Sequence, residues 1–287
     1  MKIGFIGTGV MGSGIIHNLL KNGHDVAVFT RTKSKADPLL EEGAQWASSP
    51  AELTQQVETV ITMVGFPQDV EEVYFGDHGI FSTVTSGQIL IDMTTSSPIL
   101  AEKIGKKADE LAVMALDAPV SGGDIGAQNA TLTIMVGGNQ TAFETMKPIF
   151  GQIGHATNYF GTYGAGQNAK MANQIMIAGT MTGLTEMLVY AKAARLDLKT
   201  VLETLSNGGA SNWSMENYVP RILKNDYTPG FFAKHFLKDL KIALDQAKQM
   251  QVDLPATRLA TQLYDNLVNQ QGLGDDGTQA LIKLWWK

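Results

Sequence analysis

Apolar residues cluster into five short runs in the first 160 residues or so, and helix-like segments separate these runs. A strand buried on both faces reads as a short continuous apolar run, whereas an amphipathic helix repeats its apolar positions every three to four residues. The alternation predicts a parallel sheet covered by helices on both faces. The expected strands are Lys2–Ile6, Val26–Phe29, Thr59–Val64, Gln88–Asp92 and Val113–Asp117.

Strand signals stop after about residue 163. A run without proline, Gln167–Arg195, is apolar on most sides and predicts one long buried helix. The domain is too small to bury such a helix on every side, so we expect another subunit to cover part of it. Further helical patterns follow at about 199–206, 215–224, 234–250, 255–270 and 276–285. We therefore expect an α/β fold: a doubly wound domain over residues 1–162, and an all-α domain for substrate binding and oligomerisation over 163–287.

Composition narrows the classes of function. The 287 residues carry a net charge of -6, and 44% of them are apolar, so packed cores are expected and a nucleic-acid partner is not. The chain has no cysteine, which excludes disulfides and fits the reducing cytoplasm. The stretch between Lys170 and Glu186 is too short and too polar to cross a membrane. The five histidines show no metal-ligand spacing, so no metal site is expected.

A glycine-rich turn follows the first expected strand and opens a helix. Its residues are Gly7, Thr8, Gly9, Val10, Met11 and Gly12, which form a G-x-G-x-x-G pattern. In this context the first glycine makes the tight turn, the second lets the backbone approach a pyrophosphate, and the third allows close helix–strand packing. The pattern predicts a Rossmann-type dinucleotide site.

The end of the second strand indicates which dinucleotide is preferred. NAD enzymes place an acidic residue about 20 residues beyond the glycines, to bind the ribose 2′-hydroxyl. Here the segment contains Thr30, Arg31, Thr32 and Lys35 instead. Arg31 can pair with a 2′-phosphate, with Lys35 adding charge, so NADP is favoured over NAD. The alternative is a solvated basic loop.

Two loops follow expected strand ends, where ligands bind in open α/β sheets. One is Asp92–Pro98. The other is Asp117–Gly123, in which a hydroxyl and two glycines can present N–H groups to a carboxylate. The alternative is that either loop is an ordinary turn that binds no ligand.

Lys170, Asn173 and Gln174 lie three and four residues apart, hence on one face of the long helix. Burying a lone ammonium is costly, and a buried lysine with a lowered pKa suits proton transfer. From the residues alone, a snorkelling lysine at the helix start is an equally good interpretation.

Four stretches together, Gly7–Gly12, Asp92–Pro98, Asp117–Gly123 and Gly164–Gln174, resemble the β-hydroxyacid dehydrogenase family over the full length. The family includes 3-hydroxyisobutyrate dehydrogenase and the glyoxylate, succinic semialdehyde and tartronate semialdehyde reductases. Phe236–Leu240 is a fifth match, although Lys238 and Asp239 would otherwise read as a solvated face. Two positions depart from the family pattern, which often has Asn at Gln174 and Gly at Ala130.

The resemblance implies a role for each matched residue. Lys170 matches the catalytic lysine that protonates the carbonyl oxygen. The carboxylate of the substrate would be held by the loop Ser121, Gly122 and Gly123, with Asn173 and Gln174 orienting the substrate. Val64, Thr95 and Lys238 match residues that contact the cofactor.

The implied reaction is hydride transfer between NADP(H) and a small aldehyde acid or hydroxy acid, in a cleft between the two domains of a cytoplasmic homodimer or homotetramer. Alternatives remain open. Imine reductases share the architecture but usually lack a lysine at position 170. 6-Phosphogluconate dehydrogenase shares the motifs but typically has a much longer helical domain. A non-catalytic NADP-binding module is a further alternative, although such relatives tend to lose the lysine.

Overall fold

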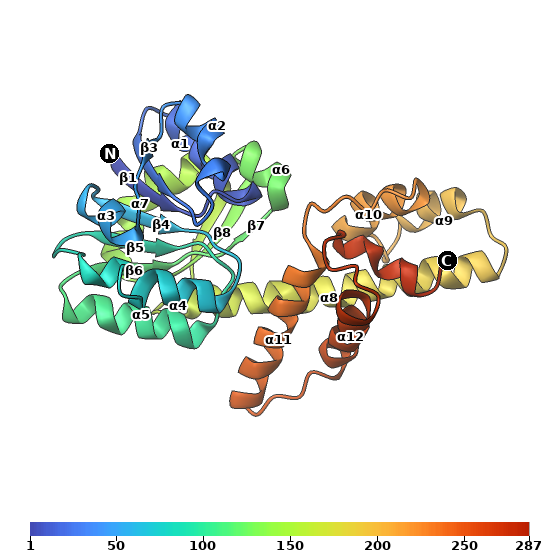
Figure 1. The fold of residues 1–287 in the computed structure, drawn as a ribbon. Coiled ribbons are helices and arrows are strands. Elements are labelled where there is room, and N and C mark those ends of the chain that lie inside the picture. The colour runs from blue at the N-terminus through green and yellow to red at the C-terminus, as the bar shows by residue number, and fades with distance from the viewer. Residues whose placement is uncertain (287) are drawn as a thin grey trace. The chain divides into compact units, whose positions relative to one another are not determined.

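A computed structural model describes residues 1–286. By its internal contacts the chain divides into two compact units, Met1–Lys170 and a second that begins at Met171 (Figure 1). Each unit is described by itself below. The expected boundary near residue 162 precedes this division, which falls inside a long helix that begins at Ala165.

The first unit is built on a nine-stranded sheet whose order is β3-β2-β1-β4-β5-β6-β8-β7, with β9 beside β8. Strands β1 to β6 pair in parallel, and β8 runs antiparallel to β6 and β7. The strands are β1 (Lys2–Ile6), β2 (Asp25–Phe29), β3 (Gln45–Trp46), β4 (Thr59–Thr62), β5 (Ile89–Asp92), β6 (Met114–Asp117), β7 (Val120–Ser121), β8 (Leu132–Gly138) and β9 (Gly154–Tyr159).

The predicted α/β class is confirmed, and all five expected strands are present, with β4 ending at Thr62 instead of Val64. Four strands were not predicted, and β8 is the longest of them. It ends in Gly137 and Gly138. A side chain at Gly137 would lie 2.6 Å from the backbone nitrogen of Gly166, so this glycine permits a close backbone approach inside the strand.

Helices cover both faces of the sheet (Figure 1). One face packs against α1 (Val10–Lys21), α2 (Asp37–Glu41) and α7 (Gln140–Ile153), and the other against α3 (Pro50–Gln55), α4 (Pro67–Phe75) and α5 (Pro98–Glu110). The short helix α6 (Gly123–Gln128) packs on α1. Helix α3 has an N-cap, because the Ser49 hydroxyl accepts a hydrogen bond from the backbone nitrogen of Glu52.

The second unit is helical. It contains the larger part of α8 (Ala165–Ala193), followed by α9 (Leu198–Leu205), α10 (Trp213–Leu223), α11 (Ala233–Gln249) and α12 (Pro255–Asp265). A π-helical turn, Asn266–Gln270, extends α12, and a 3₁₀ helix, Thr278–Leu284, replaces the last expected α-helix. Helix α11 packs on α12, and one apolar cluster joins α8, α10, α11 and α12.

One face of α8 within the second unit is exposed. Met176 and Tyr190 are 68% and 75% exposed, and side chains at Gly179 and Gly183 would meet no atom within 4 Å. Met176, Gly183 and Tyr190 are spaced by seven residues, so they share one side of the helix. The single chain therefore does not cover α8 on every side, and its burial by another subunit stays a prediction.

Among the described residues, no helix combines the length and the apolar character that a membrane span requires.

Ala130, where the family pattern has glycine, adopts a left-handed backbone with φ of 56°. This conformation places the Cβ atom of any residue except glycine close to a backbone carbonyl oxygen, at a cost of roughly 1–2 kcal/mol. Glycine relieves this cost in the folded state, but it also gives the unfolded chain more conformational freedom, which offsets part of the stabilisation. Ala130→Gly is therefore expected to raise the free energy of unfolding by about 1 kcal/mol.

Urea unfolding followed by circular dichroism measures this difference. Ala169→Gly, the same change inside helix α8 of the same unit, serves as the control and should lower the free energy by about 1 kcal/mol. A decrease for Ala130→Gly as well would show that the left-handed backbone carries no cost here.

Candidate active site

The glycine-rich turn joins β1 to α1 at the carboxyl end of the sheet. Gly7 has φ of 106°, and a side chain there would lie 2.1 Å from the carbonyl oxygen of Met63. A side chain at Gly12 would lie 2.0 Å from the carbonyl oxygen of Gly7, whereas one at Gly9 would meet no atom within 4 Å. Gly7 and Gly12 are thus required by the protein's own backbone. Gly9 instead leaves open space before the first N–H groups of α1, and this space fits the pyrophosphate of a dinucleotide.

The residues that bear on the choice of dinucleotide follow β2. Arg31 is exposed, and its guanidinium forms an ion pair with the Asp69 carboxylate at 2.9 Å. Asp69 also accepts a hydrogen bond from the backbone nitrogen of Phe66, at the start of α4. Thr30 is half-buried, and Thr32 and Lys35 are exposed. A 2′-phosphate would therefore have to compete with Asp69 for Arg31.

The loops after β4 and β5 are joined by hydrogen bonds. The backbone nitrogen of Val64 donates to the Thr94 hydroxyl at 3.0 Å. Asp92, at the end of β5, accepts from the Thr62 hydroxyl at 2.8 Å and from the backbone nitrogen of Thr94 at 3.0 Å. These bonds join the loop that holds Val64 to the backbone directly before the half-buried Thr95, so the two predicted cofactor contacts lie on adjoining loops.

The predicted carboxylate-binding loop begins in β7. Ser121 pairs with Thr133 of β8, and its side chain is half-buried. Gly122 and Gly123 follow with φ values of 130° and 64°, a backbone that strongly favours glycine. The turn therefore needs the two glycines that the sequence places there, and Gly122 is exposed at its tip.

The first turn of α8 is held by Asp117, the last residue of β6. The two oxygens of its buried carboxylate accept hydrogen bonds from the backbone nitrogens of Gly164 and Gln167, each at 2.8 Å. A carboxylate at this position also interacts favourably with the positive end of the helix dipole. A side chain at Gly166 would lie 2.5 Å from the carbonyl oxygens of Asp117 and Met135, so the helix starts directly against the sheet backbone.

Gln167 ties the same turn to the loop after β5. Its amide accepts from the backbone nitrogen of Ser96 at 2.9 Å and donates to the carbonyl oxygen of Thr94 at 2.7 Å. Lys170 lies one turn further along α8 and is only 6% exposed. The structure therefore excludes a lysine whose side chain extends freely into solvent. Sequence reasoning named Lys170 but missed Asp117 and Gln167 as the residues that hold its helix.

In the second unit the predicted substrate residues lie beside Lys238 and Asp239 of α11. Asn173 donates to the Gln174 side-chain oxygen at 2.8 Å, and Gln174 donates to Asp239 at 2.7 Å. The Lys238 ammonium lies 3.1 Å from the other Asp239 oxygen. Gln174 and Asp239 are buried and Lys238 nearly so, which contradicts the solvated face that Lys238 and Asp239 suggest in isolation.

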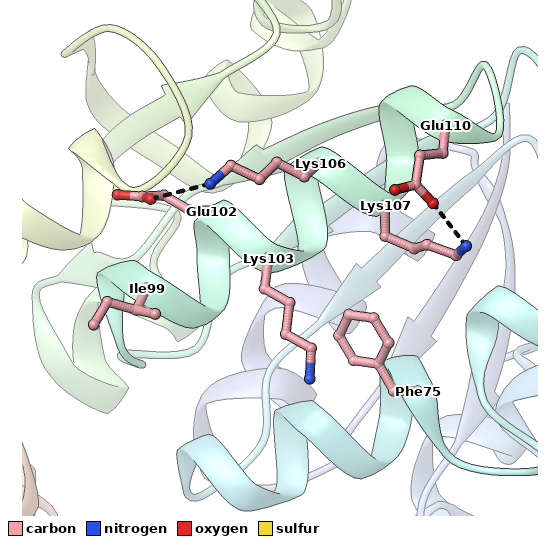
Figure 2. A pocket seen from close by; sticks show the side chains of 7 residues that line it. All are labelled: Phe75, Ile99, Glu102, Lys103, Lys106, Lys107 and Glu110. Atoms are coloured by element: carbon pink, nitrogen blue, oxygen red, sulfur yellow. Dashed lines mark hydrogen bonds and ion pairs between the residues drawn. The ribbon is translucent and has the colours of Figure 1, made fainter.

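A separate hollow runs along the outer surface of α4 and α5 and is lined by three lysines and Phe75 (Figure 2). Each of the lysines has an acidic partner: Lys103 pairs with Glu71, Lys106 with Glu102 and Lys107 with Glu110. Because these charges are already compensated, the hollow is a poor anion site. Among residues 1–286, no three His, Asp or Glu side chains gather as metal ligands would.

The parallel sheet, the glycine turn and the open space before α1 define a pyridine-nucleotide-binding oxidoreductase. Residues 2–164 match the family model described as the NAD-binding domain of 6-phosphogluconate dehydrogenase. Residues 164–285 match the family model described as NAD-binding of NADP-dependent 3-hydroxyisobutyrate dehydrogenase. The chain belongs to the β-hydroxyacid dehydrogenase family, of the NAD(P)-dependent 3-hydroxyisobutyrate dehydrogenase type.

Three similar proteins illustrate this relationship. The chain is 48% identical to a probable 3-hydroxyisobutyrate dehydrogenase-like protein of Arabidopsis thaliana, over 98% of this chain and 84% of that protein. It is 37% identical to 2-hydroxy-3-oxopropionate reductase of Escherichia coli, over 95% and 93%. A solved structure of Mycobacterium tuberculosis 3-hydroxyisobutyrate dehydrogenase with L-serine is 26% identical, with a TM-score of 0.91 over 100% of this chain and 99% of that one.

Asp117 makes the stability of the protein depend on pH. Burial raises the pKa of Asp117 to about 7, against the opposing effect of the N–H donors at Gln167 and Gly164, and the neighbouring Asp92 adds to the rise. Between pH 4 and 7 the folded protein thus keeps a proton that the unfolded chain releases. The free energy of unfolding should therefore fall as the pH rises through this window.

The expected contribution is a loss of roughly 2–3 kcal/mol between pH 5 and pH 8. Urea unfolding of the wild type and of Asp117→Asn at both pH values isolates it, because all other titrating groups are common to the two proteins. A wild type that instead gains stability over the variant as the pH rises would show that the N–H donors outweigh burial.

Proposed function

We propose that the chain catalyses reversible hydride transfer between NADP(H) and a small aldehyde acid, giving the corresponding hydroxy acid. The observation that carries the proposal is the buried Lys170 on the first turns of α8, held by Asp117 and Gln167 in the same unit as the glycine turn. The second family model, described for an NADP-dependent enzyme, supports the choice of cofactor.

The nicotinamide ring of the bound cofactor would supply or accept the hydride. Lys170 would donate the proton to the carbonyl oxygen during reduction and withdraw it from the hydroxyl during oxidation. Ser121, Gly122 and Gly123 would hold the carboxylate through backbone N–H groups and the serine hydroxyl. The glycine turn would bind the pyrophosphate at the N-terminus of α1, with Val64, Thr95 and Lys238 contacting the cofactor.

The exposed face of α8 supports a homodimer or homotetramer, since Met176 and Tyr190 on one side of the helix offer apolar surface beside two glycines. We include this assembly, in the cytoplasm, in the proposal. Multi-angle light scattering measures the assembly directly.

Replacing Lys170 by alanine is expected to lower turnover by roughly 10²–10⁴ while leaving NADPH affinity within a few-fold, because general acid help contributes about that much. The assay follows NADPH oxidation with glyoxylate, succinic semialdehyde, tartronate semialdehyde and methylmalonate semialdehyde. Cofactor affinity is measured separately by fluorescence titration.

Lys106→Ala, which removes a lysine from the outer surface of α5, serves as the matched control and should keep full turnover. Near-normal turnover by Lys170→Ala would remove this lysine from the mechanism. A wild type that binds NADPH but reduces none of the four acids would favour imine reduction or a non-catalytic role.

Arg31 and Asp69 should shift the cofactor preference in opposite directions. Arg31→Ala should lower the ratio of kcat/KM for NADPH over NADH by about tenfold or more, the effect of losing a charge-assisted hydrogen bond. Asp69→Asn should raise this ratio a few-fold, because it releases Arg31 and removes a negative charge near the 2′-phosphate. The asparagine oxygen can still accept from the backbone nitrogen of Phe66, so α4 keeps its cap.

Steady-state kinetics with both cofactors at a saturating acid concentration measures the two ratios. An unchanged ratio in Arg31→Ala would mean that Arg31 belongs to a solvated loop and that NADP selection, if present, has another source.

A further inference from the structure

The side-chain amide of Gln167 holds the backbone on both sides of Thr95. Its oxygen accepts from the backbone nitrogen of Ser96 at 2.9 Å, and its nitrogen donates to the carbonyl oxygen of Thr94 at 2.7 Å. A residue in a parallel sheet bonds its neighbour in the same way, to the C=O before it and to the N–H after it. Gln167 is fully buried, so both bonds are shielded from water. We call this pair of hydrogen bonds the Gln167 clamp.

The clamp uses the whole hydrogen-bonding pattern of an amide. The Ser96 N–H can only donate and the Thr94 carbonyl can only accept, so the side chain at position 167 must present one acceptor and one donor. The Ser96 hydroxyl does not share this task, because it is buried and has no hydrogen-bond partner among residues 1–286. At this reach glutamine offers the required pair, and so does a glutamic acid that keeps its proton.

Gln167 also lies on the helix that carries the proposed proton donor. Gln167 and Lys170 are three residues apart on α8, so their Cβ atoms lie about 5–6 Å from each other on one face. Asp117 anchors the same turn, because its carboxylate accepts from the backbone nitrogen of Gln167 at 2.8 Å. All of these residues belong to the first unit. The clamp therefore links the helix turn of Lys170 to the loop of Thr95, the predicted cofactor contact.

We propose that Gln167 is a positioning residue whose clamp keeps the Thr95 loop in register with Lys170, so that cofactor and proton donor stay aligned for hydride transfer. The inference rests on the proposed function. Gln167 touches no reacting atom and acts through Thr95 and Lys170. Such alignment matters because a displacement of about 1 Å can slow an enzymatic reaction by about 100-fold.

Gln167→Met tests the clamp, because methionine has a similar length but makes neither of the two hydrogen bonds. Turnover in NADPH oxidation with the four acids of the Lys170 assay should fall roughly 10- to 100-fold. NADPH affinity, measured by fluorescence titration, should stay within a few-fold, since the glycine turn that would bind the pyrophosphate is unchanged. Each rate is divided by the folded fraction from circular dichroism.

Gln88→Met is the matched control. Gln88 is a buried amide of the same unit that also holds backbone, because its side-chain nitrogen donates to the carbonyl oxygens of Thr54 and Val57. It directly precedes β5, whereas the Thr95 loop follows that strand, so the two amides stand at opposite ends of β5. Gln88→Met should lose stability as Gln167→Met does, and it should keep full turnover per folded molecule.

Gln167→Glu gives a readout that a purely structural role would not move. A protonated glutamic acid presents an acceptor and an O–H donor as the amide does, whereas the ionised form faces the Thr94 carbonyl without a donor. Burial and the carboxylates of Asp117 and Asp92 raise the pKa of an acid at this position, and the Lys170 ammonium opposes them. This acid is therefore protonated at about pH 6 and ionises towards about pH 9.

Turnover of Gln167→Glu relative to the wild type should be near-normal at about pH 6 and should fall roughly tenfold or more at about pH 9. Dividing by the wild-type rate at the same pH removes the effect of the groups that titrate in both proteins. The folded fraction and the NADPH affinity of the variant are measured at both pH values.

The outcomes distinguish the clamp from the proposed function. A wild type that reduces one of the acids, with Gln167→Met at wild-type turnover, overturns the clamp and leaves the proposed function intact. An equal loss in Gln88→Met also overturns the clamp, since turnover then follows stability alone. So does a relative turnover of Gln167→Glu that is the same at both pH values, and this comparison keeps the test decisive where Gln167→Met does not fold. A wild type that binds NADPH but reduces none of the acids overturns the proposed function and the inference together.

Discussion

The attachment of the first turn of α8 to the sheet is the constraint on which the rest of the site depends. Asp117 places a buried carboxylate where two backbone N–H groups of that turn have no helical partner. Burial makes the charge costly, and the hydrogen bonds and the helix dipole offset part of that cost. Gly137 and Gly166 let the two backbones meet without side chains between them. The first turn of α8 is thereby attached to the sheet, within a few residues of Lys170.

The other loops at the carboxyl edge of the sheet are tied to this turn by backbone hydrogen bonds. Gln167 connects α8 to the loop after β5 at both Thr94 and Ser96, and Thr94 reaches the end of β4 at Val64. Loops whose polar groups are satisfied in this way need little further ordering when a ligand binds, so less binding energy is lost to conformational entropy. The loops after β4 and β5, which hold the predicted cofactor contacts Val64 and Thr95, are therefore largely ordered without a ligand. Arg31 differs, because its guanidinium pairs with Asp69 and would have to leave that partner to bind a 2′-phosphate.

Much of this fold could be predicted from the sequence because continuous apolar runs leave few alternatives to buried parallel strands. The prediction failed where backbone approach, rather than side-chain pattern, determines the structure. Gly137 lies inside β8, a strand that was not predicted, and its missing side chain makes room for the start of α8. The catalytic candidate Lys170 could be named from its motif. The anchoring by Asp117 and Gln167 could not, because their partners lie 47 to 73 residues away along the chain.

Gln174 shows why a departure from a family pattern needs structural context. Asparagine and glutamine differ by one methylene group, and the sequence suggests only that a substrate contact comes from a longer amide. In the structure the extra reach serves another partner, Asp239, which lies 65 residues further along the chain on α11. A carboxylate accepts and never donates when ionised, so it imposes one orientation on each amide in turn. The Gln174 amide is thus oriented by a carboxylate on α11, and it orients the Asn173 amide in turn.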